Sequence, residues 1–207
     1  MNIIEFEFEN WYTFCLRFNW LVLIIATIII AIVGFIIKRT SSILSYHSVY
    51  VDEVSLGIGK NNIKIKYDKK DQEIAYKLWV ELNTRKIGLQ YEEEYDVINE
   101  VYNSWYEFFK IARELLKDIP PNRLPHSSKL ITLTTDVLNV GLRPHLTKWQ
   151  AKFRKWYSSN DDSKKTPQQI QRDFPGYDDL IADLLETNKH MIEYKKLMFQ
   201  IAFDKKQ

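Results

Sequence analysis

The stretch best equipped for chemistry is residues 141–157, which carries five Lys or Arg residues and several aromatic residues but no acidic one. Positions three and four apart share one face of a helix. That spacing predicts a basic stripe beside an aromatic stripe. The basic stripe is Lys148, Lys152 and Lys155, and the aromatic stripe is Trp149, Phe153 and Trp156. Lysine attracts phosphate and an aromatic ring stacks on a base, so the pattern is typical of nucleotide or nucleic-acid binding.

Two other interpretations fit the same stretch. The basic stripe could lie on anionic lipid, or the aromatic stripe could be buried in a helical bundle while the lysines face water. An acidic run is expected at the start of an earlier helix, and it could neutralise the basic stripe within the bundle or between subunits. Its members are Glu92, Glu93, Glu94, Asp96 and Glu100. The sequence leaves these three interpretations open.

We expect a basic pocket for an anionic ligand in the domain that contains this stretch. Its cations are drawn from a predicted hairpin, from the end of the helix that follows it and from the basic run. The predicted ligand-binding residues are Lys64, Lys66, Arg85, Lys86, Arg143, Lys148 and Lys152.

Enzyme signatures are not found in the sequence. It lacks a Walker-type phosphate loop, a dinucleotide fingerprint and a G-x-S-x-G elbow. The four histidines have no partner at metal-ligand spacing, and Cys15 is the single cysteine, which excludes an internal disulfide. We therefore expect a protein that is not an enzyme and uses neither a metal nor another cofactor.

The elements that must position the pocket begin with a β-hairpin. Val54, Leu56 and Ile58 alternate with polar neighbours, residues 57–62 supply turn chemistry, and residues 63–67 alternate again. From residue 71 the apolar period becomes helical. It predicts helices near 71–87, 97–119, 128–140, 145–157 and 177–203, with Gly141 and Pro144 separating the third from the fourth. A capping box at residues 166–169 predicts one more short helix.

Residues 21–37 contain no charged side chain. With Trp20 they form a helix about 27 Å long, against a bilayer core of about 30 Å. We therefore predict a transmembrane helix. Thr27, Ala31 and Gly34 share one face of it, and small residues on one face allow membrane helices to pack closely.

Lysine and arginine flank the predicted span mainly on its C-terminal side, beginning with Lys38 and Arg39. That asymmetry places the N-terminus outside and the remaining domain in the cytoplasm, so we expect a single-pass membrane protein. Residues 1–19 fit an amphipathic helix that supplies an aromatic belt, although Ile4, Phe6 and Phe8 alternate with glutamates as in a strand.

Three pieces of the chain, residues 77–89, 102–106 and 141–157, are similar to a family of small bacterial proteins found near anti-phage and mobile-element genes. The layout also resembles single-span effectors of nucleotide-signalled defence systems, of which the Hailong type is one. The resemblance implies an oligomeric pore of anti-phage defence in the bacterial inner membrane, controlled by a nucleotide. Its ligand would be a cyclic or linear oligonucleotide made by a partner nucleotidyltransferase.

These observations predict a mainly α protein. Residues 1–39 hold the N-terminal segment and transmembrane helix, residues 40–69 a linker and the β-hairpin, and residues 70–207 a cytoplasmic bundle of about five helices. We expect a homo-oligomeric membrane effector whose partners are the lipid bilayer, its own copies and an oligonucleotide. The alternative is a membrane-tethered adaptor that recruits a partner protein without forming a pore.

Overall fold

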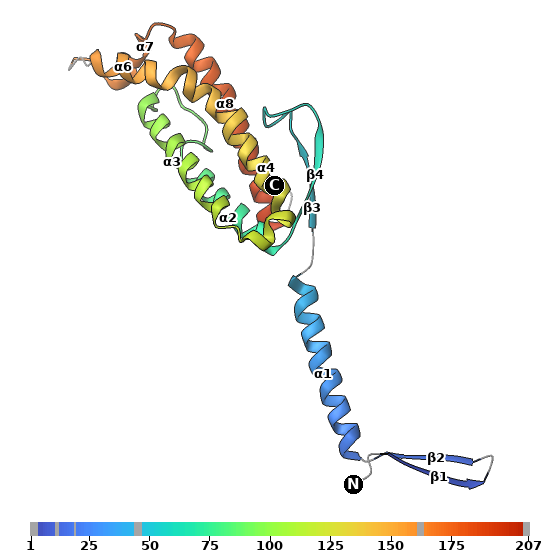
Figure 1. Cartoon of the computed structure of the whole chain (residues 1–207). Coiled ribbons are helices and arrows are strands. Elements are labelled where there is room, and N and C mark those ends of the chain that lie inside the picture. The colour runs from blue at the N-terminus through green and yellow to red at the C-terminus, as the bar shows by residue number, and fades with distance from the viewer. Residues whose placement is uncertain (1–3, 11–12, 19, 44–46, 161–163, 205–207) are drawn as a thin grey trace. The chain divides into compact units, whose positions relative to one another are not determined.

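The computed structural model (Figure 1) describes residues 4–10, 13–18, 20–43, 47–160 and 164–204 of the 207-residue chain. Side chains are described for residues 20, 21, 23–38, 47–160 and 164–204. The protein is mainly helical, at 73%, and carries an antiparallel hairpin, which confirms the predicted fold class at this level. The chain forms two compact units, residues 1–45 and residues 46–207.

The first unit begins with a β-hairpin where we expected an amphipathic helix. Strands β1 (Ile4–Asn10) and β2 (Thr13–Phe18) are antiparallel, with Ile4 opposite Phe18 and Phe8 opposite Phe14. The alternation of apolar residues with glutamates has the period of a strand and was the better signal.

Helix α1 (Trp20–Ile43) has 24 residues and includes the uncharged segment 21–37. Its large apolar side chains are exposed, from 44% at Leu21 to 70% at Ile30. Within the described side chains, no helix is both long enough and apolar enough to cross a membrane.

The second unit opens with strands β3 (His47–Asp52) and β4 (Asn62–Tyr67), which pair antiparallel with Val49 opposite Ile65. The first strand therefore lies several residues earlier than the predicted 54–58, which form the connecting loop instead. That loop is anchored by Leu56, which is buried. Gly57, at φ 69°, lies so close to His190 that a Cβ would clash with the imidazole ring.

Helices α2 (Lys69–Thr84), α3 (Ile98–Lys117) and α8 (Tyr177–Phe203) match the predicted periodicity closely. Helix α2 packs along α8 (Figure 1). Asp68 caps α2 with a capping box, and Thr166 does the same for α7 (Pro167–Arg172), as predicted for the second. The core of this unit is aromatic-rich, with Trp105, Tyr102, Tyr194, Phe108 and Phe153 fully buried.

The predicted break at Gly141 and Pro144 is wrong. After a short 3₁₀ turn, η1 (Pro121–Arg123), one helical path runs through α4 (Leu124–Asp136), η2 (Val137–Leu142), α5 (Arg143–His145), η3 (Leu146–Gln150) and α6 (Ala151–Ser159). Segments η2 and η3 are π-helical. Proline has no backbone N–H, and its ring crowds the preceding turn of an α-helix. The wider π-helical turns accommodate both effects, so the helical path continues through Pro144. The hairpin loop lies against Gly141, where a Cβ would be in ordinary contact with Leu56 O at 3.7 Å.

Two buried amides hold the connection between α2 and α3. Asn188 on α8 accepts a hydrogen bond from the Tyr91 N–H and donates to the carbonyls of Ile87 and Leu89. Gln171 on α7 accepts from the Ile98 N–H at 2.9 Å and donates to Asp96 O. These bonds satisfy backbone groups that would otherwise be buried without partners, and they fix α3 relative to α7 and α8.

Candidate ligand-binding groove

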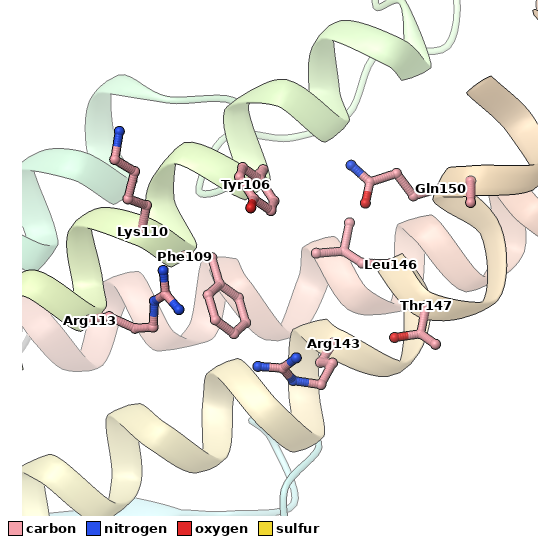
Figure 2. A pocket seen from close by; sticks show the side chains of 9 residues that line it. Tyr106, Phe109, Lys110, Arg113, Arg143, Leu146, Thr147 and Gln150 are labelled. Atoms are coloured by element: carbon pink, nitrogen blue, oxygen red, sulfur yellow. The ribbon is translucent and has the colours of Figure 1, made fainter. Parts of the chain in front are cut away.

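A groove of about 370 Å³ lies between α3 and the helical path from α5 to α6. One wall comes from α3 and the other from the turns that follow Arg143 (Figure 2). We call this the cationic groove. Its lining residues are Tyr106, Phe109, Lys110, Arg113, Arg143, Leu146, Thr147, Gln150 and Ala151.

Two guanidinium groups, one from each wall, lie against the ring of Phe109. The Cζ atom of Arg143 is 4.8 Å from the ring centroid, and that of Arg113 is 5.6 Å from it. Arginine stacks well on an aromatic ring through cation–π attraction. Arg143 Nε also donates to Asn139 Oδ1 at 3.1 Å. The two cations are therefore positioned by neutral partners before any ligand arrives.

No acidic side chain lines the cationic groove, and within the described chain neither Arg113 nor Arg143 has a salt bridge. Lys110 has one weak surface contact, 3.8 Å from Glu107. The two arginines and Lys110 give the groove a positive lining that attracts an anion, and Glu107 and Glu114 on α3 offset only part of the charge of Lys110 and Arg113. Arginine also offers paired donors that match phosphate oxygens.

The opposite end of the groove is neutral. Figure 2 shows Gln150 and Thr147 on the side away from Arg113, with Tyr106 across from them. The Tyr106 side chain is 59% exposed, so its ring has a free face. A ring that stacks on Tyr106 would place its polar edge near an amide and a hydroxyl. One end of the groove thus carries an aromatic ring and an amide, and the other end carries the cations.

A buried polar cluster lies directly behind this groove. The Tyr102 hydroxyl donates to His145 Nε2 at 3.1 Å, and His145 Nδ1 donates to Asp183 Oδ2 at 2.9 Å. Trp149 Nε1 donates to the same oxygen at 2.7 Å. The cluster joins α3, α5, η3 and α8. His145 is 2% exposed and Tyr102 fully buried, so the pair has no open face for a substrate.

Burial sets the protonation of this cluster. It lowers the pKa of His145, and the nearby Asp183 carboxylate offsets only part of that effect. Burial also raises the pKa of the Tyr102 phenol. At neutral pH the cluster therefore consists of a neutral imidazole, a neutral phenol and one carboxylate, with each imidazole nitrogen bonded. We interpret it as a satisfied structural network.

The predicted basic pocket is not assembled as one site, since only Arg143 lines the cationic groove. Lys64 and Lys66 lie exposed on β4. Arg85 is paired with Glu81 one turn earlier, and Lys86 with Asp96 at 2.8 Å. The latter two cations are thus largely neutralised by carboxylates.

The basic and aromatic stripes face different surroundings. Trp149 and Phe153 are buried in the core, whereas Lys148 and Lys152 are exposed. The Lys148 ammonium lies 4.6 Å from the Trp149 ring centroid and 3.9 Å from Asp183. The buried rings are unavailable for stacking on a base. The burial of these aromatics agrees with the third interpretation above.

The acidic run does not neutralise the basic stripe among the described ion pairs. Of its members only Glu100 lies in α3, and the others precede the helix. Asp96 pairs with Lys86, while Glu93 accepts from the Tyr177 hydroxyl at 3.2 Å and lies 3.8 Å from Arg172. These acidic residues brace the connection before α3 instead.

The three small residues predicted to pack membrane helices lie within α1. Thr27 donates its hydroxyl to Ile24 O at 2.8 Å, which leaves no polar group of its side chain unpaired. Apart from Gly34 itself, its two chain neighbours and the backbone of its own helix, nothing described lies within 4 Å of the position where a Cβ on Gly34 would be. In this unit the face formed by Thr27, Ala31 and Gly34 is open.

Sequence reasoning missed most of the cationic groove. The missed residues are Tyr106, Phe109, Lys110, Arg113, Leu146, Thr147, Gln150 and Ala151. A signal was present, because Tyr106, Phe109 and Arg113 recur at helical spacing on the exposed side of α3. Phe109 follows the fully buried Phe108 in the sequence but is itself only half-buried. Among the described residues, no group of His, Cys, Asp and Glu side chains is arranged to hold a metal ion.

Comparison with known proteins gives no relative: no family model, no curated protein and no solved structure matches the chain.

Proposed function

We propose that this protein is a membrane effector whose second unit binds a nucleotide or oligonucleotide in the cationic groove. Copies assemble through α1 in a bilayer, and ligand binding controls a pore that they form. The observation that carries the ligand half of this proposal is the pair Arg113 and Arg143 held against Phe109 with no acidic partner.

A nucleotide fits this groove better than a simple anion does. Phosphates would meet the two guanidinium groups, a base would stack on the exposed ring of Tyr106, and Gln150 would contact the polar edge of the base (Figure 2). A volume of about 370 Å³ is at the lower end of the range for small-molecule sites. An open groove also allows a longer oligonucleotide to extend beyond it.

The membrane half of the proposal is supported by α1. Its exposed isoleucines form an apolar surface that water does not favour, and segment 21–37 carries no charge to oppose insertion. One helix cannot enclose a channel, so a pore requires several copies. The open face of Thr27, Ala31 and Gly34 suits close packing between them.

The test begins with binding to the full-length protein in detergent. Titration calorimetry with ATP, a tetra-adenylate and pyrophosphate should give tighter binding for the two ligands that contain a base. Arg113→Glu and Arg143→Glu should each weaken binding at least about thirtyfold, since a charged contact worth about 2 kcal/mol is replaced by repulsion. Lys189→Glu, an exposed charge reversal on α8, is the matched control and should bind normally.

Pore activity is tested on the same preparations in planar lipid bilayers. We expect conductance that depends on the ligand identified by calorimetry and that is lost in Arg113→Glu. A bilayer that stays silent with and without that ligand would contradict the pore. Equal binding by wild type and both arginine variants would contradict the groove as the ligand site.

One observation supports a membrane-tethered adaptor as the alternative. Tyr76 and Trp79 of α2 and Phe199 and Phe203 of α8 form an aromatic patch, with Tyr76 47% and Phe203 38% exposed. Aromatic patches of this kind are common where a partner protein binds. Gly34→Leu distinguishes the two functions, because a bulky side chain would disrupt a pore but leave a simple anchor intact.

A further inference from the structure

A second cationic site lies between the hairpin and the first turn of α4, separate from the cationic groove. It is a pocket of about 580 Å³. We call it the hairpin pocket. Its lining residues are His47, Ser48, Lys66, Pro125, His126, Ser128 and Lys129. Every one of these except the proline carries a polar side chain, and none is acidic.

Neither of the two lysines that line the hairpin pocket has a carboxylate partner among the described ion pairs. Lys129 Nζ donates to a neutral acceptor, the backbone carbonyl of Lys64, at 2.8 Å. Lys66 has no ion pair within the described residues. Lys64 projects from the same face of β4 as Lys66, because alternate residues of a strand share a face. Two lysines, Lys66 and Lys129, therefore line the pocket, while the Lys64 ammonium lies 5.3 Å from the Tyr50 ring centroid.

The Asp204 carboxylate, which lies beside the pocket, is already engaged. Asp204 accepts from the Tyr67 hydroxyl at 2.6 Å, and its other oxygen lies 2.9 Å from His47 Nδ1. It does not line the pocket. The hydroxyl of Ser48, which pairs with Lys66 across the hairpin, adds a hydrogen-bonding group of the kind that contacts a bound phosphate.

The position of this pocket in the chain indicates the source of the phosphate. Only residues 44–46 separate the end of α1 from His47. At about 3.6 Å per residue, covalent connection keeps His47 within about 15 Å of Ile43, whatever the arrangement of the two units. If α1 lies in a bilayer, the pocket is thus confined to the neighbourhood of the lipid headgroups.

We propose that the hairpin pocket binds the phosphodiester headgroup of an anionic lipid through Lys66 and Lys129. This inference rests on the proposed membrane role of α1. Anionic headgroups attract clustered lysines near a membrane surface. Binding there would dock the second unit on the membrane independently of any ligand in the cationic groove.

The test uses the full-length protein in a non-ionic detergent and follows thermal unfolding by tryptophan fluorescence. Dihexanoyl-phosphatidylglycerol should raise the unfolding midpoint by about 5 °C at a concentration about 100-fold above its Kd. Dihexanoyl-phosphatidylcholine carries a phosphate without net negative charge and should give no shift. Inorganic phosphate should bind at least about tenfold more weakly than the phosphatidylglycerol.

The double variant Lys66→Gln with Lys129→Gln should lose the shift, while its midpoint without lipid confirms that it folds. Both side chains are exposed. The matched pair Lys152→Gln with Lys155→Gln should keep the shift. An absent shift, or one that survives in the first double variant, overturns the proposal. Inorganic phosphate that binds as tightly as the lipid would also overturn it and would identify the pocket as a site for free phosphate.

Resistance of the full-length protein to carbonate extraction from membranes tests the role of α1 separately. If carbonate extracts the protein, the proposed membrane function is contradicted, whatever the result of the lipid titrations. If the protein stays in the membrane but phosphatidylglycerol does not shift its unfolding midpoint, only the proposed role of the hairpin pocket is contradicted.

Discussion

Arg143 and His145 belong to the same short helix, α5, two residues apart, yet they have opposite surroundings. Arg143 is exposed, stacks on Phe109 and has no described ion pair. His145 is buried and has a hydrogen-bond partner at each ring nitrogen. A polar group with all its bonds made inside the protein mainly supports the fold. A cation without a counter-charge on a concave surface is available to a ligand.

The most severe way to break this contrast is to remove the acceptor at the centre of the buried cluster. Asp183→Ala leaves the N–H groups of His145 and Trp149 without their shared partner. We expect a loss of about 3 kcal/mol in the free energy of unfolding, measured by urea denaturation. Glu186→Ala removes an exposed carboxylate one turn along α8 and should change stability by less than about 0.5 kcal/mol. Equal effects would refute a structural role for the cluster.

A smaller effect is expected on the groove side. Phe109→Leu keeps an apolar side chain but removes the ring on which Arg113 and Arg143 lie. Nucleotide affinity should fall about tenfold by calorimetry, which corresponds to about 1.4 kcal/mol, because the cations lose their positioning. Stability should fall by less than about 1.5 kcal/mol. Unchanged affinity would show that the ring plays no part in binding.

Acid pH tests the structural role of the buried cluster, because it affects the protonation of His145. Its pKa in the folded state lies below the value of about 6.5 in the unfolded chain. Below pH 6.5 the imidazole of His145 therefore binds a proton more readily in the unfolded state than in the folded state. The free energy of unfolding consequently falls as the pH falls. The slope from one such proton is at most about 1.4 kcal/mol per pH unit. His190 shifts in the same direction.

The measurement is urea denaturation between pH 5 and pH 7.5 for wild type, His145→Gln and His190→Gln. His145→Gln should be less stable at neutral pH but should lose less stability on acidification. A pH slope that is the same in His145→Gln and wild type would assign the acid sensitivity to other groups.

The smallest effect is expected for Lys152→Glu. Lys152 is exposed, lies outside both cationic pockets and has no described ion pair, although the sequence placed it in the ligand site. Nucleotide affinity should change less than twofold and stability by less than about 0.5 kcal/mol. A large loss of affinity would restore the basic stripe as the binding surface.

The sequence by itself determined the features that depend on local periodicity and composition. The bounds of α2, α3 and α8, the capping box at Thr166 and the uncharged run at 21–37 follow from neighbouring residues alone. Apolar spacing, capping chemistry and charge exclusion act within a few turns of chain, so a single sequence is enough to reveal them.

Only the tertiary structure decided which cations meet and which are neutralised. Arg113 and Arg143 are 30 positions apart in the sequence and come together because α3 packs beside α5 and η3. The helix passes through Gly141 and Pro144 because two π-helical segments absorb the mismatch. Electrostatic pairing and close packing depend on distances in space, which sequence separation does not encode. For that reason the sequence singled out Arg143 but could not predict most of the groove.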